Sequence, residues 1–390
     1  MKRQVTCGDV KIGGGAPISI QSMTNTKTAD VEATMRQIDR LTEAGCEIIR
    51  LAVPDRDAAE ALKEIKRRSK IPVVADIHFD YKLALASMEA GVDKIRINPG
   101  NIGSEENVRK VVEMAKARRI PIRVGVNSGS LEKDIVARDG GVTAEGLAES
   151  ALRNVRLLEK FDFEDIVISL KSSNVKMNDQ AYRIVDASCD YPLHIGVTEA
   201  GTPARGRTKS AAGIGALLLS GIGDTMRVSL TADPVQEVLF ARELLDVLDI
   251  RKSGIEIVSC PTCGRTEVDL ERIIERIEAR LEPLKKAFEA RRTGGAAMAG
   301  GLETAVAGGA TGTDSAPAAA GMKIAVMGCV VNGPGEAREA DIGVACGKGK
   351  GVLIQKGEIL KQVDEENIPE EICRLAEEYA EITYGIHTIR

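Results

Sequence analysis

Short apolar runs rich in valine and isoleucine alternate with longer amphipathic segments over residues 1–250. Runs of this composition are typical of buried parallel strands, and the segments between them have helical periodicity. In the first such segment, Val31, Met35, Ile38 and Leu41 fall on one helical face. Gly45 is placed to end that helix. The expected strands are Ile18–Met23, Glu47–Val53, Pro72–Ile77, Lys94–Asn98, Ile122–Asn127, Ile166–Lys171, Leu193–Glu199 and Met226–Thr231.

Eight successive β-α units predict an α/β fold in which residues 1–250 form a TIM (β/α)8 barrel. This fold repeats the unit eight times in about 250 residues. A doubly wound sheet is the competing architecture. The count of eight favours the barrel, as does the lack of a glycine-rich dinucleotide fingerprint after the first strand.

The pattern changes after the barrel, and we predict a smaller α+β domain over residues 251–390. Gly254–Ser259 is expected to be a strand, and a strongly charged helix follows over about 266–291. Residues 292–321 are mostly Gly, Ala, Thr and Ser without periodicity, which predicts a disordered insertion. Three short strands (323–331, 341–345 and 352–354) and a helix over about 366–384 complete the domain.

The net charge and the lack of long apolar runs argue against several classes of protein. The net charge of −5 argues against a general binder of nucleic acid or of membrane surfaces, which carries a basic excess. No apolar run follows Lys2 and Arg3, and no stretch approaches the roughly 18 apolar residues of a membrane span. We therefore expect a cytoplasmic protein whose eight cysteines are reduced and available as ligands.

Three cysteines stand at strand ends beside glycine and proline, where backbone amides can approach and hydrogen-bond sulfur. Cys260 and Cys263 form a C-x-x-C pair, and Cys329 lies in a glycine-rich turn. A structural zinc would need a fourth Cys or His, and the chain has only three histidines. The fourth ligand could be Cys346, or Glu336, seven residues after Cys329 on the same turn. The set favours an iron–sulfur cluster over zinc.

Charged side chains recur at the carboxyl ends of the expected barrel strands. In a barrel these ends meet at one mouth, where binding sites of this fold are built. Five cations with few acids suit a polyanion such as a diphosphate, although a lone strand-end arginine is more often part of a structural ion pair. The acidic exceptions, Asp76 and Glu199, could donate protons or orient the cations. The ring comprises Arg50, His78, Arg96, Asn98, Arg123, Asn127, Lys171, Arg227 and Ser229.

Several motifs, in order along nearly the whole chain, carry a family resemblance. They include Ala-Asp-Ile-His-Phe, Arg-Ile-Asn-Pro-Gly-Asn, Ser-Cys-Pro-Thr-Cys-Gly-Arg and Gly-Cys-Val-Val-Asn-Gly-Pro-Gly-Glu. The chain closely resembles the 4-hydroxy-3-methylbut-2-enyl diphosphate synthase family of the bacterial two-domain type. The resemblance implies reductive ring opening and dehydroxylation of 2-C-methyl-D-erythritol 2,4-cyclodiphosphate in isoprenoid biosynthesis, with two electrons passed through a [4Fe–4S] cluster. The segment 292–321 is longer than the family's pattern.

The resemblance also assigns residues and partners. It implies a homodimer in which one chain's cluster domain covers the other chain's barrel, with flavodoxin or ferredoxin as the electron donor. The implied cluster ligands are Cys260, Cys263, Cys329 and Glu336, and Glu199 matches the family's acidic catalytic position. The implied substrate-binding residues are Arg50, His78, Arg96, Arg123, Asn127, Lys171, Arg227 and Ser229.

Two other functions remain open from the residues alone. One is a barrel enzyme of the pteridine or transferase kind with a structural zinc domain. The other is a non-catalytic protein that only stores a cluster. The basic barrel mouth argues against this second function.

Overall fold

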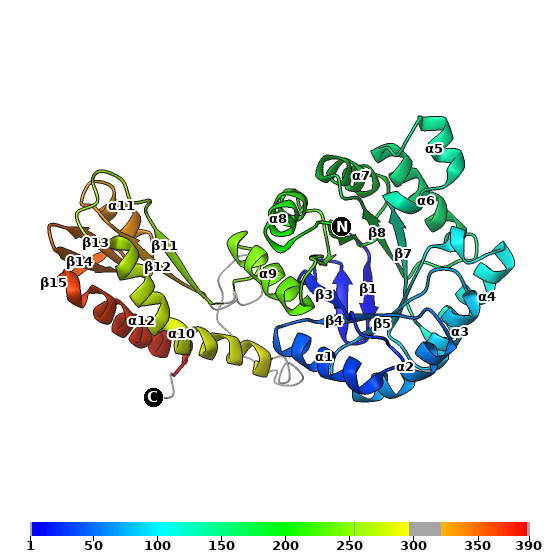
Figure 1. The fold of residues 1–390 in the computed structure, drawn as a ribbon, viewed down its shortest axis with the longest axis horizontal. Coiled ribbons are helices and arrows are strands. Elements are labelled where there is room, and N and C mark those ends of the chain that lie inside the picture. Colours follow the sequence, from blue (N-terminus) through cyan, green and yellow to red (C-terminus); the bar gives the residue numbers. More distant parts are fainter. Residues whose placement is uncertain (1, 253, 296–320, 388–390) are drawn as a thin grey trace, which may run out of the picture. The chain divides into compact units, whose positions relative to one another are not determined.

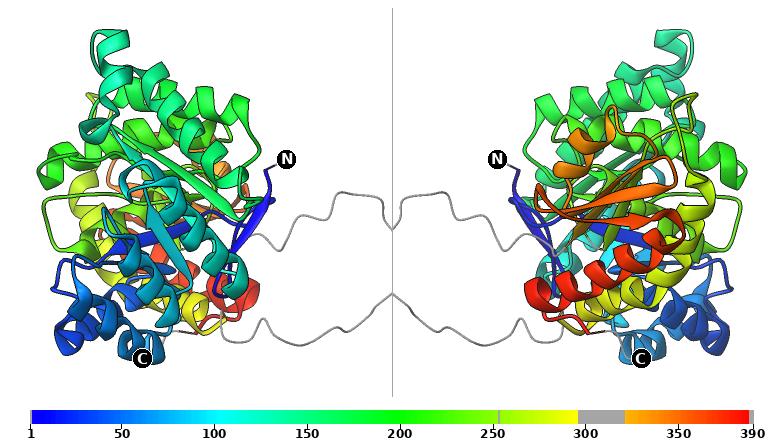
Figure 2. Two further views of the ribbon diagram at one scale, coloured as in Figure 1. Left: turned by 90° about the vertical axis from the view of Figure 1, so that its right-hand side faces the viewer. Right: turned by 90° about the vertical axis from the view of Figure 1, so that its left-hand side faces the viewer.

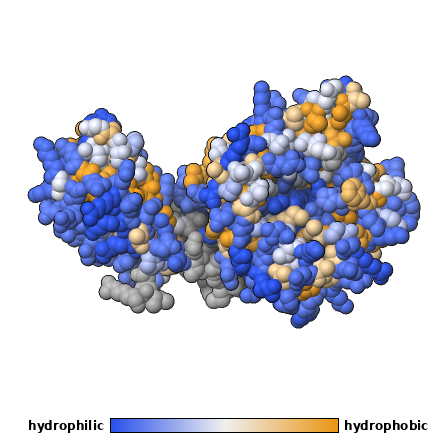
Figure 3. All heavy atoms as spheres, in the orientation of Figure 1, coloured by the Kyte–Doolittle hydropathy of each residue, from blue (hydrophilic) through white to orange (hydrophobic). Residues whose placement is uncertain are grey.

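A computed structural model describes residues 2–252, 254–295 and 321–387. The chain divides into two compact units, Met1–Leu248 and Asp249–Arg390, each with its own core (Figure 1). No helix in the described ranges is both long and apolar enough to cross a membrane. The face seen in Figure 3 is mainly hydrophilic, with apolar residues in small groups, because the cores take up most apolar side chains.

The first unit contains eight parallel strands in the order β8-β7-β6-β5-β4-β3-β10-β9. A parallel bridge between Ile168 and Leu193 joins the two ends of this sheet, so the strands form a barrel. The TIM-barrel prediction is confirmed, and the doubly wound alternative is wrong. The strands are β3 (Ser19–Met23), β4 (Ile48–Ala52), β5 (Val73–Asp76), β6 (Lys94–Ile97), β7 (Ile122–Asn127), β8 (Ile166–Lys171), β9 (His194–Ile195) and β10 (Thr225–Met226).

Helices surround the barrel, as the views in Figure 2 show. The first, α1 (Val31–Glu43), begins where the Asp30 side chain accepts from the N–H of Ala33. It buries Met35, Ile38 and Leu41 as predicted, whereas Val31 at its start is only partly buried. Gly45 follows it with φ +101°, a conformation that glycine adopts readily. The others are α2 (Arg56–Arg68), α3 (Tyr81–Glu89), α4 (Glu105–Arg118), α5 (Lys133–Asp139), α6 (Ala144–Glu159), α7 (Val175–Ser188), α8 (Pro203–Leu219) and α9 (Pro234–Val247).

An antiparallel hairpin that the sequence analysis did not predict precedes the barrel strands. It consists of β1 (Gln4–Cys7) and β2 (Val10–Gly13). Its buried side chains pack against three residues in the first half of the barrel strands, so the hairpin covers the end of the barrel opposite the charged strand ends. The cluster consists of Val5, Cys7, Ile12, Ile48, Val74 and Val167.

The second unit is a five-stranded sheet with helices on both faces. Strands β11 (Ile255–Ser259), β12 (Met322–Met327) and β13 (Ile342–Gly347) are parallel. Strands β14 (Lys350–Gln355) and β15 (Glu358–Asp364) continue the sheet antiparallel.

Helices α10 (Leu270–Gly295) and α12 (Ile368–Tyr384) lie side by side over one face of this sheet (Figure 2). The short α11 (Gly333–Arg338) packs on the other face through Ala337.

Two predictions for this unit need correction. Three strands were expected between Lys323 and Ile354, but the sheet also includes β15, whose side chains are mostly exposed and do not alternate. The predicted disordered insertion at 292–321 begins too early, because α10 continues to Gly295. Residues 296–320 lie outside the described residues.

Candidate functional site

Charged side chains occupy the interior of the barrel toward the carboxyl ends of its strands. Five consecutive strands each place one there, and all five side chains are buried, with exposed fractions between 1% and 9%. Ionised groups are costly to bury unless other charges or a ligand compensate them. The five are Arg50 on β4, Asp76 on β5, Arg96 on β6, Arg123 on β7 and Lys171 on β8.

Asp76 is the centre of this group. Its carboxylate lies 3.1 Å from Nη1 of Arg96, 3.5 Å from Nε of Arg50 and 3.7 Å from Nε2 of His78. Burial acts to raise the pKa of Asp76, but Arg50, His78 and Arg96 outweigh it and hold the pKa well below its ordinary value. Asp76 is therefore ionised, and its role is to orient these cations. The sequence alone had left open whether Asp76 orients the cations or donates a proton.

A second carboxylate, Glu237, serves Arg227 in the same way. Glu237 lies on α9 and is 3.2 Å from Nη2 of Arg227. It also accepts from the N–H of Leu230 at 2.9 Å. The sequence analysis missed Glu237, because a glutamate within a helix carries no signal that its side chain turns toward the barrel.

Arg50 and Arg227 also meet at Met23, the last residue of β3. The sulfur of Met23 lies 2.9 Å from Nη2 of Arg50 and 3.8 Å from Nη1 of Arg227. The two arginines from β4 and the segment after β10 are thus brought to the same side of the barrel mouth.

Arg123 and Lys171 have no carboxylate within 4 Å in the described part of the chain. Nε and Nη1 of Arg123 are buried without a hydrogen-bond partner there. Burial, together with repulsion from the neighbouring arginines, lowers the pKa of both Arg123 and Lys171 well below the ordinary value. Five cationic side chains face two carboxylates (5 − 2 = 3), so the mouth has three more cationic side chains than carboxylates.

The other predicted mouth residues lie farther out. His78 is exposed and its ring nitrogens are 3.3 and 3.4 Å from Nη1 of Arg96. Asn127 ends β7 and Ser229 follows β10, and both are partly buried. Glu199 is exposed in the segment after β9, with φ +50° in the left-handed region. Its exposure leaves it accessible to a ligand in the mouth.

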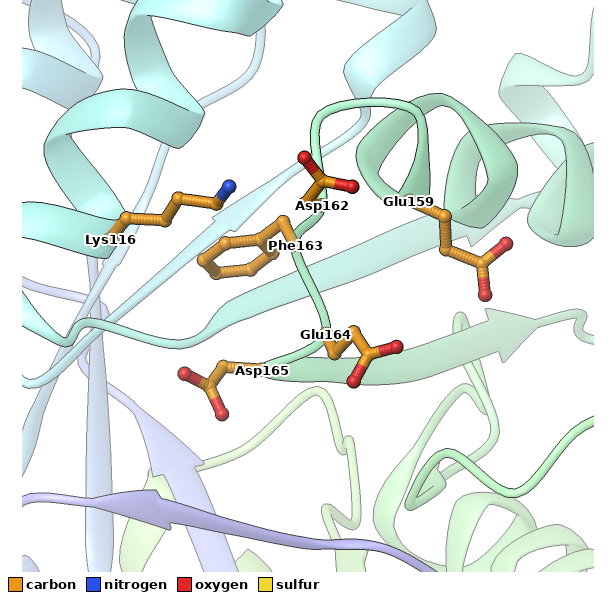
Figure 4. A pocket seen from close by; sticks show the side chains of 6 residues that line it. All are labelled: Lys116, Glu159, Asp162, Phe163, Glu164 and Asp165. Atoms are coloured by element: carbon orange, nitrogen blue, oxygen red, sulfur yellow. The ribbon is translucent and has the colours of Figure 1, made fainter.

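A different hollow, of about 580 Å³, involves the turn from Glu159 to Asp165 that precedes β8 (Figure 4). It therefore lies at the amino ends of the strands, away from the cationic mouth. Four carboxylates and one lysine, Lys116, line it. Because that lining repels anions, the hollow is not a candidate for a phosphorylated ligand.

In the second unit, the predicted cysteines lie at neighbouring strand ends. Strands β11 and β12 pair in parallel with Ser259 opposite Val326, so Cys260 and Cys329 follow the same edge of the sheet. The N–H of Gly328 donates to Sγ of Cys260 at 3.2 Å. The sulfur of Cys260 therefore lies beside a backbone N–H donor.

The other thiols of the set also face hydrogen-bond donors. The N–H groups of Asn332 and Val331 lower the pKa of Cys329. The backbone and side chain of Arg265 lower the pKa of Cys263. Both shifts favour thiolate, which is the form that binds metals.

The two candidates for the fourth ligand differ in setting. Glu336 is exposed on α11, directly after the glycine-rich turn. Cys346 is fully buried at the end of β13 within the apolar core, and burial raises its pKa to about 12. Glu336 is therefore better placed to reach a group bound by Cys329. Among the described residues, no three Cys, His, Asp or Glu side chains are close enough together to hold a single metal ion.

Comparison with known families identifies the chain. The GcpE TIM-barrel domain matches residues 2–242, and the GcpE protein C-terminal domain matches residues 256–378. The chain belongs to the GcpE family. Both units of this GcpE chain are thus accounted for, and the family resemblance inferred from the motifs is confirmed.

Close relatives of this GcpE chain share one name, 4-hydroxy-3-methylbut-2-en-1-yl diphosphate synthase (flavodoxin). The protein from Fusobacterium nucleatum is 54% identical over 96% of this chain and 97% of its own length. That from Caldanaerobacter subterraneus is also 54% identical, over 96% of each chain. That from Geobacillus kaustophilus is 51% identical over 97% of this chain and 93% of its own.

Proposed function

We propose that this GcpE chain converts 2-C-methyl-D-erythritol 2,4-cyclodiphosphate to 4-hydroxy-3-methylbut-2-enyl diphosphate in isoprenoid biosynthesis. The reaction takes up two electrons and one proton, opens the ring and releases one hydroxyl as water. The observation that carries the proposal is the mouth in which cationic side chains outnumber carboxylates by three. The names of relatives that share half of the sequence support the same reaction.

The diphosphate is the part of the substrate that the barrel binds. Arg123 and Lys171, which lack carboxylate partners in the described structure, bind its oxygens directly, and Arg50, Arg96 and Arg227 complete the ring. Guanidinium groups suit this role because they bind phosphate oxygens with two parallel hydrogen bonds. His78, Asn127 and Ser229 contribute from the rim.

The donor set of the second unit fits a [4Fe–4S] cluster. Cys260, Cys263 and Cys329 supply thiolates, and backbone N–H groups lie at the sulfurs of Cys260 and Cys329. Such donors are typical of cluster sites and tune their potential. The ligands of a cluster bind separate irons, so they need not converge as the ligands of one zinc ion do. Glu336 completes the set as the fourth ligand.

When bound, the cluster would supply the two electrons, and Glu336 would hold it through oxygen, a weaker ligand for iron than thiolate. The residues of the barrel do the rest. The cations hold the diphosphate, while the exposed Glu199 supplies the proton that leaves with the hydroxyl as water.

The proposal includes partners and place. Flavodoxin is the electron donor we favour, since the relatives are named for it, and ferredoxin is the alternative. The working form is a cytoplasmic homodimer, in which the cluster unit of one chain serves the barrel of the other. The proposed function involves neither a nucleic acid nor a membrane as partner.

The test is an anaerobic assay of the reconstituted protein with the cyclic diphosphate and a chemical reductant. We expect iron and sulfide in equal amounts, a brown colour, and conversion to the open diphosphate. Cys260→Ser should abolish both the colour and the conversion, whereas the control Cys189→Ser, in the barrel unit, should keep both. Zinc at the thiols, or no conversion by the iron-loaded protein, would contradict the proposal.

A further inference from the structure

Lys94 is a buried cation that the binding of diphosphate does not by itself explain. It begins β6, two residues before Arg96, so both side chains point into the barrel. Lys94 is 0% exposed, and its Nζ has no hydrogen-bond partner among the described residues. Lysines are almost never buried without a partner, so this position requires a reason.

The surroundings of Lys94 below the mouth are apolar. Its neighbour across the sheet is Val74, which belongs to the cluster that covers the end of the barrel together with Cys7 of the hairpin. The nearest acid in sequence, Asp93, is already engaged. Its Oδ2 accepts from the N–H of Val73 at 2.7 Å and lies 2.7 Å from Nζ of Lys66 on α2. From below, Cys7 and Asp93 act to raise the pKa of Lys94, but burial outweighs them and keeps the pKa below its ordinary value.

Above Lys94 lie the cations of the mouth and Asp76, whose carboxylate is already paired with Arg96 and Arg50. Burial lowers the pKa of Lys94, and repulsion by Arg123 and Arg50 acts in the same direction. Two residues along a strand correspond to about 7 Å, which places the Lys94 level one step below that of Arg96. Unit charges at such separations interact appreciably in a protein interior. A protonated Lys94 thus adds to the positive potential of the mouth, and its Nζ has no hydrogen-bond partner in the described structure of the free protein.

We propose that Lys94 is a positioning residue for the bound anion, whose buried charge destabilises the free barrel and is compensated when a diphosphate enters the mouth. Lys94 does not touch the phosphate. It acts through Arg123, whose guanidinium it repels toward the mouth. The proposal rests on the proposed function, because it assumes that the mouth binds a diphosphate.

The test compares Lys94→Met with Lys63→Met, which removes the same charge from the exposed face of α2. Calorimetry with inorganic pyrophosphate measures binding, and denaturant unfolding measures the stability of the free protein. Lys94→Met should bind pyrophosphate more weakly, on the order of tenfold, and yet unfold at higher denaturant concentration. Lys63→Met should change neither. A purely structural role would lower stability and affinity together.

Lys94→Gln separates charge from polarity, and should bind pyrophosphate as weakly as Lys94→Met. Unchanged affinity in either variant, or a Lys94→Met protein that is less stable or fails to fold, would overturn the role of Lys94. Wild-type protein that binds neither pyrophosphate nor the cyclic diphosphate would instead overturn the proposed function, and this inference with it. Wild-type binding with equal affinity in Lys94→Met overturns only the inference about Lys94.

Discussion

At the scale of single residues, the barrel mouth depends on one carboxylate that holds several cations. Asp76 is 3% exposed and lies within 4 Å of Arg50, His78 and Arg96. Removing one partner of a buried ion pair is much worse than removing both, because it leaves the other charge buried and uncompensated. Asp76 is therefore needed for the folded state before any ligand binds.

Asp76→Asn should lower the free energy of unfolding by about 3 kcal/mol, because it leaves Arg50 and Arg96 without their anion. Urea unfolding at neutral pH measures the loss. The control is Glu64→Gln, which breaks an exposed pair with Arg67 and should have a much smaller effect on the free energy of unfolding. Equal effects of the two variants would show that the buried cations do not depend on Asp76.

The same carboxylate gives the stability a pH dependence of known sign. Its pKa in the folded protein lies below the value of about 3.9 in the unfolded chain. The stabilisation is thus complete at neutral pH and is lost as the pH falls below that value toward the folded pKa. Wild type should therefore lose more stability than Asp76→Asn between about pH 5 and pH 3. Parallel curves for the two proteins would contradict this.

Most of the candidate mouth was predictable at this scale because charges at the ends of apolar strands stand out. Arg50, Arg96, Arg123 and Lys171 were found in this way, and the structure buries all four together. Glu237 could not be found, since only the fold turns that helix position toward Arg227.

At the scale of elements, inward-facing glycines give the long cations room. A Cβ on Gly125 of β7 would lie 2.3 Å from Nε of Arg96, and one on Gly196 after β9 would lie 3.2 Å from Nζ of Lys171. Neither glycine has the positive φ that would itself require glycine. Gly125 is needed because Arg96 of the neighbouring strand fills the space of a methyl group, whereas at Gly196 a Cβ would first meet the backbone oxygen of Arg227, at 2.6 Å.

Gly125→Ala should therefore displace Arg96 from Asp76 and destabilise the protein by about 1–3 kcal/mol, as overpacking does. Pyrophosphate binding should weaken as well, because Arg96 leaves the ring. The control is Gly129→Ala, in the turn directly after the same strand, where a Cβ meets nothing within 4 Å. Denaturant unfolding of both variants decides, and a Gly125→Ala protein as stable as the control would refute the packing argument.

The elements that the sequence did not predict are those that lack a periodic apolar face. Strand β15 was missed because six of its seven residues are exposed, including Ile359 and Leu360. The last two barrel strands were expected over six to seven residues, but β9 and β10 each span two, because the chain leaves the ladder early to form the mouth. The hairpin before the barrel has only four residues in each strand, too few to show a period.

At the scale of the whole molecule, the two units have separate cores, and their candidate sites suit different groups: an anion in the barrel and a cluster in the second unit. The barrel buries more cationic side chains than carboxylates, and the proposed function assigns an anion to compensate them. The second unit has an apolar core of its own, and of its three candidate ligand thiols Cys263 is exposed, Cys260 is partly exposed and Cys329 is buried. An anion should therefore act on one unit and the cluster on the other.

Scanning calorimetry of the cluster-free protein should accordingly resolve two unfolding transitions. Pyrophosphate should raise only the transition of the barrel unit, because a ligand that binds the folded state alone stabilises it by mass action, by about 2.7 kcal/mol at a hundred times its Kd. Reconstitution with iron and sulfide should raise only the other transition, and Cys260→Ser should remove that shift while leaving the effect of pyrophosphate unchanged. A single transition that both ligands shift equally would mean that the units unfold as one, and the assignment of anion and cluster to separate units would then have to be tested by direct binding.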